Sequence, residues 1–467
     1  MDNFIGFDKR KIWRLPRPSL DLTPASQDYD EVTQIVFLNE YNPHGHRIFN
    51  RLWYPDITLK SPEDEMIGIY EVNRVSLPIQ KMAIDIILAH LLGNKTYIED
   101  SSSDDNPALI EYKEYWEDKN IDTVRYDLLK SVLATGDGAA LFYKKKGELK
   151  CKVLSAFKRD KFYMDYDKFG DPTHFYHHYK VREVEVVNGK NVPKDITYCD
   201  VYDEQKVYTF SNEAGKWMQI DVVNHGFKGI PVAYKSRDEG AYWTHVQTNI
   251  DNLEIMFSRL SEDNRGKFKS MYHMAVSDPE RVGTLKAGNM DVVITEEDGK
   301  FNLISGADLS SQFKYEYETQ LEMVFQSLGI VFPKHKSSGD MPTGSMKMMF
   351  YPTERVVMSL IHEFDSTIDA INDIVLQGFL HETNKFADDI LKGNIRASIR
   401  MFTPQDDSTK VDSIVKLKNA GVLSTQTSSE ESPYTSNNEK KRIDAEIDED
   451  LAVKKKRADL RISEFDF

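Results

Sequence analysis

The stretch from residue 311 to residue 382 constrains the fold of this chain most. In its second half, apolar side chains recur at steps of three and four: Val357, Leu360, Phe364, Ile368, Ile371 and Val375. This pattern predicts one helix of roughly 30 residues, about 45 Å long at 1.5 Å per residue. Helices average about 11–12 residues, so we expect this one to be a spine packed against other helices. Pro352 suits its first turn, where a missing N–H costs nothing.

A shorter helix and a polar loop precede this spine. Leu321, Val324, Phe325 and Leu328 have helical spacing, and Gly329 and Pro333 end the pattern. Residues 334–350 have no apolar period and contain two glycines, so we expect a mobile loop there. No apolar run in this region reaches the roughly 20 residues of a membrane span.

Composition indicates a large protein that is made and kept in solution. With 467 residues, the chain can bury a sizeable core and is expected to form about two to four domains. Its 76 acidic and 60 basic residues give a net charge of −16, which argues against a simple phosphate clamp. Cys151 and Cys199 stand in unrelated strand-like contexts, so a disulfide framework is not expected. The N-terminus lacks the apolar core of a signal peptide.

The N-terminal part is expected to be irregular at first and then helical. Residues 1–50 are rich in Pro, Asp and Asn and predict an extended arm; His44 and His46 have no further Cys or His nearby and fit a loop better than a metal site. Residues 73–93 predict a buried helix with Ser76 as its N-cap and Gly93 at its end. Two further helices are expected at 106–118 and 121–135.

The Gly136-Asp-Gly138 stretch is a candidate phosphate loop that we interpret as a turn. It follows a helix and opens the strand 139–143, whereas phosphate-binding loops follow a strand and open a helix. The order of the elements therefore argues against a nucleotide site.

Residues 148–235 change to short β-branched and aromatic segments separated by turns. Strands are expected at 151–157, 161–165, 174–183, 184–188, 196–203, 206–211, 217–223 and 230–235, with Asn188-Gly189 as a hairpin turn. In a strand, His174 and His178 lie about 13 Å apart, at ~3.3 Å per residue, and His177 points to the other face. We therefore expect no metal site among these histidines.

The next part predicts two antiparallel helices that carry a small insert. A helix is expected over residues 245–272, with the basic residues Arg259, Arg265, Lys267 and Lys269 in its far half. These cations fit a solvated face that complements the helix dipole, or contact with a passing polyanion, and both interpretations stay open. The compact αβ insert, residues 273–308, has expected strands at 273–276, 291–294 and 301–304.

The C-terminal part is expected to return to the core and then become helical. A short amphipathic segment is expected at 384–392, a strand at 395–402 and a helix at 406–420. A charged helix over residues 439–461 contains a basic run at 454–457, which we interpret as a solvated face. Across the chain, no catalytic triad, paired-carboxylate motif, Walker loop or Cys/His metal spacing is present, so we expect no enzyme, cofactor or metal.

Taken in order from Asn73 to Asp450, these parts resemble the portal proteins of tailed bacteriophages. The shared features are the early helix ending in Leu-x-Gly, the helix–Gly–strand unit at 122–143, and the β-meander ending in Gly-Ile-Pro-Val. Gly344-Ser-Met-Lys347 stands near the place of the family's Ser-Gly-x-Ala-Leu-Lys pattern, although Gly-Ser reverses the usual order. Lys416-Leu-Lys-Asn-Ala-Gly-Val-Leu-Ser424 resembles the Leu-x-x-x-Gly-x-x-Ser region that enters the crown.

The resemblance implies an α+β subunit with an α/β wing, a two-helix stem, a small αβ clip, a long spine helix and a helical crown. The implied divisions are an N-terminal arm or wing periphery (1–72), the wing (73–244), the first stem helix (245–272), the clip (273–308), the second stem helix (309–333), the tunnel loop (334–350), the spine and return to the wing (351–404), and the crown and tail (405–467).

The resemblance also implies a function. Portal subunits form a homomeric ring, twelve-fold in virions, at one capsid vertex, where DNA enters and leaves through the channel. The implied partners are other copies of the chain, double-stranded DNA, the terminase large subunit, the major capsid or scaffold protein and a head-completion adaptor, with assembly in the host bacterial cytoplasm and no membrane. The channel residues would be Lys334, Lys336, Met341, Met346, Lys347 and Met348, with the four stem cations. The alternative is another ring-forming adaptor of a virus or secretion system, without a DNA-packaging role.

Overall fold

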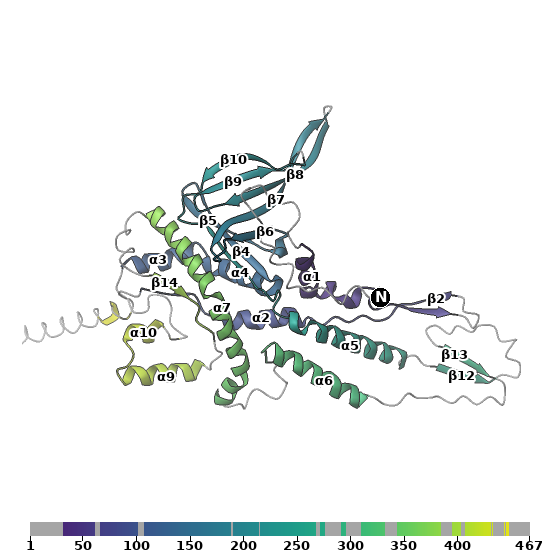
Figure 1. The fold of residues 1–467 in the computed structure, drawn as a ribbon. Coiled ribbons are helices and arrows are strands. Elements are labelled where there is room, and N and C mark those ends of the chain that lie inside the picture. Colours follow the sequence, from purple (N-terminus) through teal and green to yellow (C-terminus); the bar gives the residue numbers. More distant parts are fainter. Residues whose placement is uncertain are drawn as a thin grey trace, which may run out of the picture. The chain divides into compact units, whose positions relative to one another are not determined.

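The computed structural model describes residues 31–60, 66–100, 107–187, 190–213, 215–267, 271–275, 291–295, 310–331, 343–383, 395–402, 407–430, 432, 443 and 445–447. Helices and sheets are mixed, which confirms the expected α+β class (Figure 1). The chain divides into two compact units: residues 1–333 with 352–402, and residues 334–351 with 403–467.

The N-terminal part is more regular than the sequence indicated. Helix α1 (Glu31–Tyr41) is followed by the 3-10 turns η1 (Pro43–Gly45) and η2 (Arg47–Phe49) and by the antiparallel pair β1 (Ile57–Lys60) and β2 (Met66–Tyr70). The expectation of an irregular arm is therefore wrong for residues 31–49. Phe37 and Ile48 are fully buried, and their burial stabilises this segment against the core.

Three helices confirm the next part of the prediction. They are α2 (Ile79–Leu92), α3 (Pro107–Asp118) and α4 (Ile121–Thr135). Pro78, rather than Ser76, occupies the N-cap position of α2, without a side-chain capping bond, so the cap prediction was wrong. Gly136 ends α4 with a φ of 87°, a left-handed conformation that glycine adopts without strain, which fits the interpretation of this stretch as a turn.

Two antiparallel sheets follow. The three-stranded sheet has the order β11-β4-β5, from β4 (Asp137–Lys145), β5 (Glu148–Leu154) and β11 (Val232–Ser236). After the turn η3 (Ala156–Lys158), the five-stranded sheet has the order β10-β9-β8-β7-β6, from β6 (Lys161–Tyr166), β7 (Pro172–Val187), β8 (Lys190–Tyr202), β9 (Lys206–Ser211) and β10 (Met218–Asn224). The two strands expected at 174–183 and 184–188 form one long strand. Val187 pairs with Lys190, as the predicted hairpin requires.

The spine is helix α7 (Thr343–Thr383), and it begins earlier than expected. All six residues of its predicted apolar seam are buried, at most 4% exposed, in the main core. Residues 343–350, expected to be part of a mobile loop, are helical, and Pro352 lies inside the helix instead of in its first turn. Met and Lys favour helix, and the 41-residue helix tolerates the one backbone bond that Pro352 removes.

The remaining elements form the stalk, the return to the core and the C-terminal part. The turn η4 (Thr244–Val246) leads into α5 (Gln247–Lys267), and α6 (Ser310–Ser327) follows the parallel pair β12 (Met271–Ala275) and β13 (Asp291–Thr295). Strand β14 (Ile395–Ser398) pairs with β3 (Tyr97–Asp100), and α9 (Asp407–Asn419) and α10 (Thr425–Glu430) follow. The strand expected at 301–304, the segment at 384–392 and most of the 439–461 helix lie outside the described residues.

Candidate functional site

Helix α5 is the centre of the candidate site, and its apolar face packs against α6. Leu253 of α5 is fully buried in the same core cluster as Val324 of α6. The rings of Phe257 and Tyr317 have their centroids 5.6 Å apart, and the two helices run side by side (Figure 1). The two helices expected here are therefore present and packed, and we name the pair the stalk.

A second face of α5 is polar and buried. Asp251, Glu254, Ser258 and Glu262 recur at steps of three and four along it. Nδ1 of His46 lies 2.5 Å from Oε1 of Glu254, and the backbone N–H of Leu77 donates to the same oxygen at 2.8 Å. Burial raises the pKa of Asp251, which faces Arg47 at 3.5 Å. These contacts hold α5 to residues 46–57 and 66–77, which we name the clasp.

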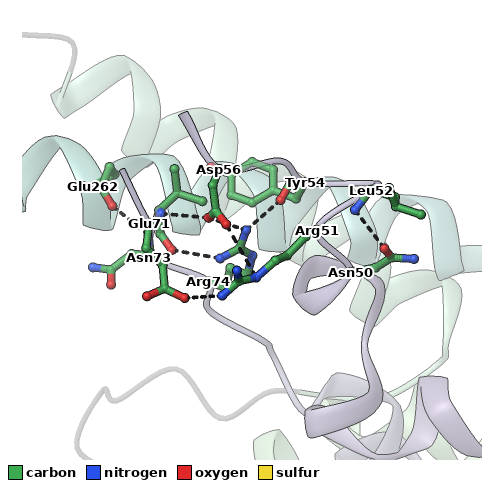
Figure 2. A network of polar contacts seen from close by, with 10 residues as sticks. Asn50, Arg51, Leu52, Tyr54, Asp56, Glu71, Asn73, Arg74 and Glu262 are labelled. Carbon is green, nitrogen blue, oxygen red and sulfur yellow. Dashed lines mark hydrogen bonds and ion pairs between the residues drawn. The ribbon is translucent and has the colours of Figure 1, made fainter. Parts of the chain in front are cut away.

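The clasp is also bonded to itself (Figure 2). Nη2 of Arg74 donates to Oδ1 of Asp56 at 2.7 Å and to the carbonyl of Tyr54 at 2.9 Å. Both side chains of the Arg74–Asp56 pair are 8% exposed, and the bond from Arg74 lowers the pKa of Asp56. At the far end of the clasp, the backbone N–H of Asn73 donates to Glu262 at 2.7 Å. The clasp therefore forms a fixed layer on α5.

The end of α6 is attached to the same core. The hydroxyl of Tyr242 donates to the carbonyl of Leu328 at 2.7 Å, and Nε2 of His245 lies 3.2 Å from the carbonyl of Ser327. These side chains satisfy carbonyls that a helix C-terminus leaves without backbone partners. Gly329 then reverses the chain with a φ of 63°. Both helices of the stalk are thus fixed where they meet the core.

The third face of α5 is open to solvent and carries one of the four predicted stem cations. Arg259 is exposed, and so is Asn252, which lies about two turns earlier on the same face of the helix. Arg265 and Lys267 lie on α5, but their side chains are not described, and Lys269 lies outside the described residues. The basic stretch therefore begins on the face of α5 that neither the clasp nor α6 covers.

The predicted tunnel-loop residues fall in the other compact unit. Met348 is exposed on α7, whereas the side chains of Met346 and Lys347 on the same helix are not described. Lys334, Lys336 and Met341 lie outside the described residues.

Sequence reasoning missed the clasp. The available signal was the polar stripe at helical spacing on α5, together with His46, which had been interpreted only as a loop residue. The side chains of His46 and Glu254 are 1% and 0% exposed. Their contact joins two segments that are 208 residues apart in sequence. Nothing near either residue in sequence indicates its partner.

The histidines of β7 lie among aromatic rings. Burial lowers the pKa of His177 to about 3, and His178 stacks on Tyr163. Within the described ranges, no three His, Cys, Asp or Glu side chains are grouped as metal ligands. Among the helices of the same ranges, none is both long and apolar enough to cross a membrane.

Comparisons with known proteins give a family match and similar solved structures. Residues 27–452 match the family described as phage portal protein, SPP1 Gp6-like. No curated protein matches the sequence. Two solved structures are similar at TM-scores of 0.37 each: the neck of an empty GTA particle computed with C6 symmetry, at 11% identity over 75% of this chain and 88% of that chain, and the virion of a native gene transfer agent (GTA) particle, at 10% identity over 90% and 94%.

These TM-scores are low, so the likeness to the two particles alone establishes neither fold nor function. The family match covers residues 27–452, which include the clasp, both stalk helices and the whole of α7. This chain belongs to the SPP1 Gp6-like family of phage portal proteins.

Proposed function

We propose that copies of this chain form a homomeric ring at one vertex of a phage capsid, and that DNA is packaged and ejected through its central channel. The match to the portal family over residues 27–452 is the observation that carries this proposal. The stalk supports it, because a helix pair fixed to the core can stand beside a channel. The protein would be structural rather than catalytic and would act in the virion.

The charge of the chain suits a conduit. Each phosphate that a protein neutralises adds affinity through counterion release, and tight binding would stall a moving duplex. A net charge of −16 in every subunit repels phosphates and keeps such binding weak.

A few cations would then guide the duplex through transient contacts. On the stalk, Arg259, Arg265, Lys267 and Lys269 would face the channel, with the open face of α5 turned to the ring axis. At the constriction, Lys334, Lys336 and Lys347 would touch phosphates, and Met341, Met346 and Met348 would supply adaptable apolar packing. The clip, residues 273–308, would receive the terminase, and the capsid or scaffold protein and a head-completion adaptor would bind elsewhere on the ring.

A packaging reaction with purified capsids and terminase tests this function. Changing Lys334, Lys336 and Lys347 together to Ala should lower the amount of DNA packaged or retained. The matched control changes three exposed lysines of the β-sheet turns, Lys145, Lys168 and Lys216, to Ala and should package like the unchanged protein. Unchanged packaging and retention in the loop variant would remove the role of the loop.

The same reaction separates the main proposal from the alternative. A ring-forming adaptor without a packaging role would leave DNA uptake unchanged when it is omitted from the capsid. A portal is required for uptake, so capsids assembled without this chain should take up no DNA.

A further inference from the structure

The outer surface of the clasp displays apolar side chains on a fixed loop. Leu52 is 95% exposed, and Phe49 and Trp53 beside it are each more than a third exposed. The backbone N–H of Leu52 donates to Oδ1 of Asn50 at 2.9 Å (Figure 2). The backbone N–H of Tyr54 donates to the Asn50 carbonyl at 2.9 Å. These bonds fix the backbone that presents Leu52 to solvent, which lowers the cost of ordering the loop on binding.

The charged side chains exposed on this surface are mostly cationic, and the surface is hollowed. The side chains of Arg47 and Arg51 are 56% and 67% exposed, whereas their carboxylate partners Asp251 and Asp56 are 7% and 8% exposed. The carboxylate of Glu71 is 70% exposed and lies 2.6 Å from Arg51, so two exposed guanidinium groups stand beside one exposed carboxylate. Beside the loop, a hollow of about 320 Å³ is lined by Phe49, Glu71, Val72, Asn73 and Arg74.

Helix α6 has a complementary outer face. Tyr315 and Met323, eight residues apart, are 74% and 54% exposed, on the side of α6 away from the buried Val324 and Leu328. Glu316 and Glu322 are exposed on the same side. This face therefore combines apolar side chains with negative charge, where the clasp combines them with positive charge.

The two surfaces lie on different sides of one helix. The clasp bonds to α5 through Asp251, Glu254 and Glu262, whereas α6 packs on α5 through Leu253 and Phe257. A surface that meets a different surface of an identical copy makes a head-to-tail contact, which closes into a ring when the rotation allows it. Contacts between two α6 faces would instead bring like charges together.

We infer that the clasp of one subunit docks on the outer face of α6 of a second copy of this chain. The inference rests on the proposed ring, and it specifies which two surfaces of adjacent subunits contact each other. Opposite charge identifies a second copy of the chain as the partner of the clasp. In a chain of net charge −16, two copies approach favourably where exposed cations of one meet exposed carboxylates of the other. The apolar side chains Leu52 and Tyr315 would then be buried between subunits.

Cysteine crosslinking tests the contact directly. A chain carrying both Leu52→Cys and Met323→Cys is treated with a short bismaleimide and run on a denaturing gel. The natural thiols supply little background, since Cys199 is buried and burial raises the pKa of Cys151 to about 12. A head-to-tail contact gives a ladder that rises to the number of subunits in the ring, and each single variant gives no ladder.

The results separate this inference from the proposed function. Rings in the microscope without a ladder would overturn the clasp–α6 contact and leave the ring intact. Crosslinking that stops at the dimer would also overturn it, because it indicates a two-fold contact. Absence of rings in the unchanged protein would instead contradict the proposed function.

Charge exchange supplies an independent readout. The pair Arg47→Glu and Arg51→Glu, and separately the pair Glu316→Lys and Glu322→Lys, should each reduce ring formation roughly tenfold or more at low salt. Mixing the two variants should restore rings, because each altered face then meets its opposite. Assembly that is unaffected by either pair, or variants that stay monomeric after mixing although folded by circular dichroism, would contradict the inference.

Discussion

Nδ1 of His46 lies 2.5 Å from Oε1 of Glu254, and both side chains are almost completely buried. The pair joins the segment after α1 to the first stalk helix. Glu254 also accepts a hydrogen bond from the backbone N–H of Leu77, so one carboxylate contacts both segments of the clasp. The position of the clasp on α5 therefore depends in part on a buried polar contact.

The first prediction concerns this pair. His46→Ala leaves the buried Glu254 carboxylate with one donor, so we expect the free energy of unfolding to fall by about 3–5 kcal/mol in urea titrations. Arg47→Ala, next to it in sequence but 56% exposed, is the control and should cost less than about 1 kcal/mol. Equal effects of the two changes would show that the buried pair does not hold the clasp.

The second prediction concerns Asp137, whose two oxygens each lie 2.8 Å from Nε2 of Gln34. Burial raises the pKa of Asp137 from 3.8 to about 7. Below about pH 4 the folded and unfolded chains both hold this proton. Between pH 4 and pH 7 only the folded chain keeps it, so stability falls as the pH rises and levels off above 7.

Asp137→Asn removes this titration. Relative to the variant, the unchanged protein should therefore lose about 2–4 kcal/mol of unfolding free energy between pH 4 and pH 7. Thermal or urea unfolding across that range measures the difference. Asp127→Asn, at an exposed position of α4, is the control and should follow the unchanged protein. A constant difference between unchanged protein and Asp137→Asn would refute the prediction.

The third prediction concerns the turn between the stalk and the spine. Gly329 has a φ of 63°, and a Cβ added there would lie 2.3 Å from Cγ2 of Val356. Gly329→Ala should cost more than the roughly 1–2 kcal/mol of a left-handed alanine, because Val356 or the turn must also move. Gly147→Ala, with a φ of 85° and open space around it, isolates the backbone cost. Equal Tm losses for the two variants would mean that the close packing at Gly329 is absent.

The fourth prediction concerns the return of the chain to the core. Asn372 on α7 accepts the hydroxyl of Tyr112 at 2.9 Å and donates to the carbonyl of Ile395 at 3.0 Å. Asn372→Leu leaves both partners buried without these bonds and should cost about 2–4 kcal/mol, at about 1–3 for each group. Tyr112→Phe removes only one hydroxyl and should cost about 1 kcal/mol. Hydrogen exchange of strand β14 would show whether the loss is local, and unchanged exchange in Asn372→Leu would argue against this anchor.

The parts of the fold that were predictable are those whose buried faces are apolar at a regular period. The seam of α7 and the helices α3 and α4 are of this kind, since most of their apolar side chains lie in the same core. Helix α1 was missed because two of its buried positions are Gln34 and Glu40. Their partners, Asp137 and Trp243, are more than 100 residues away.

The clasp was not predictable for the same reason. A buried polar pair such as His46 and Glu254 has no local period, and its two members become neighbours only after the chain has folded. The helical start of α7 was not predictable for another reason. A proline such as Pro352 normally marks the first turn of a helix, but here it lies inside a longer helix. The predicted channel residues follow from the family resemblance, and they stay a prediction.

The central claim is that this chain assembles into a ring with an axial channel, and negative-stain electron microscopy of the purified protein tests it most directly. We predict mushroom-shaped rings with a central hole wide enough for a DNA duplex. Monomers, filaments or closed rings without a hole, at the concentrations used for assembly, would contradict it.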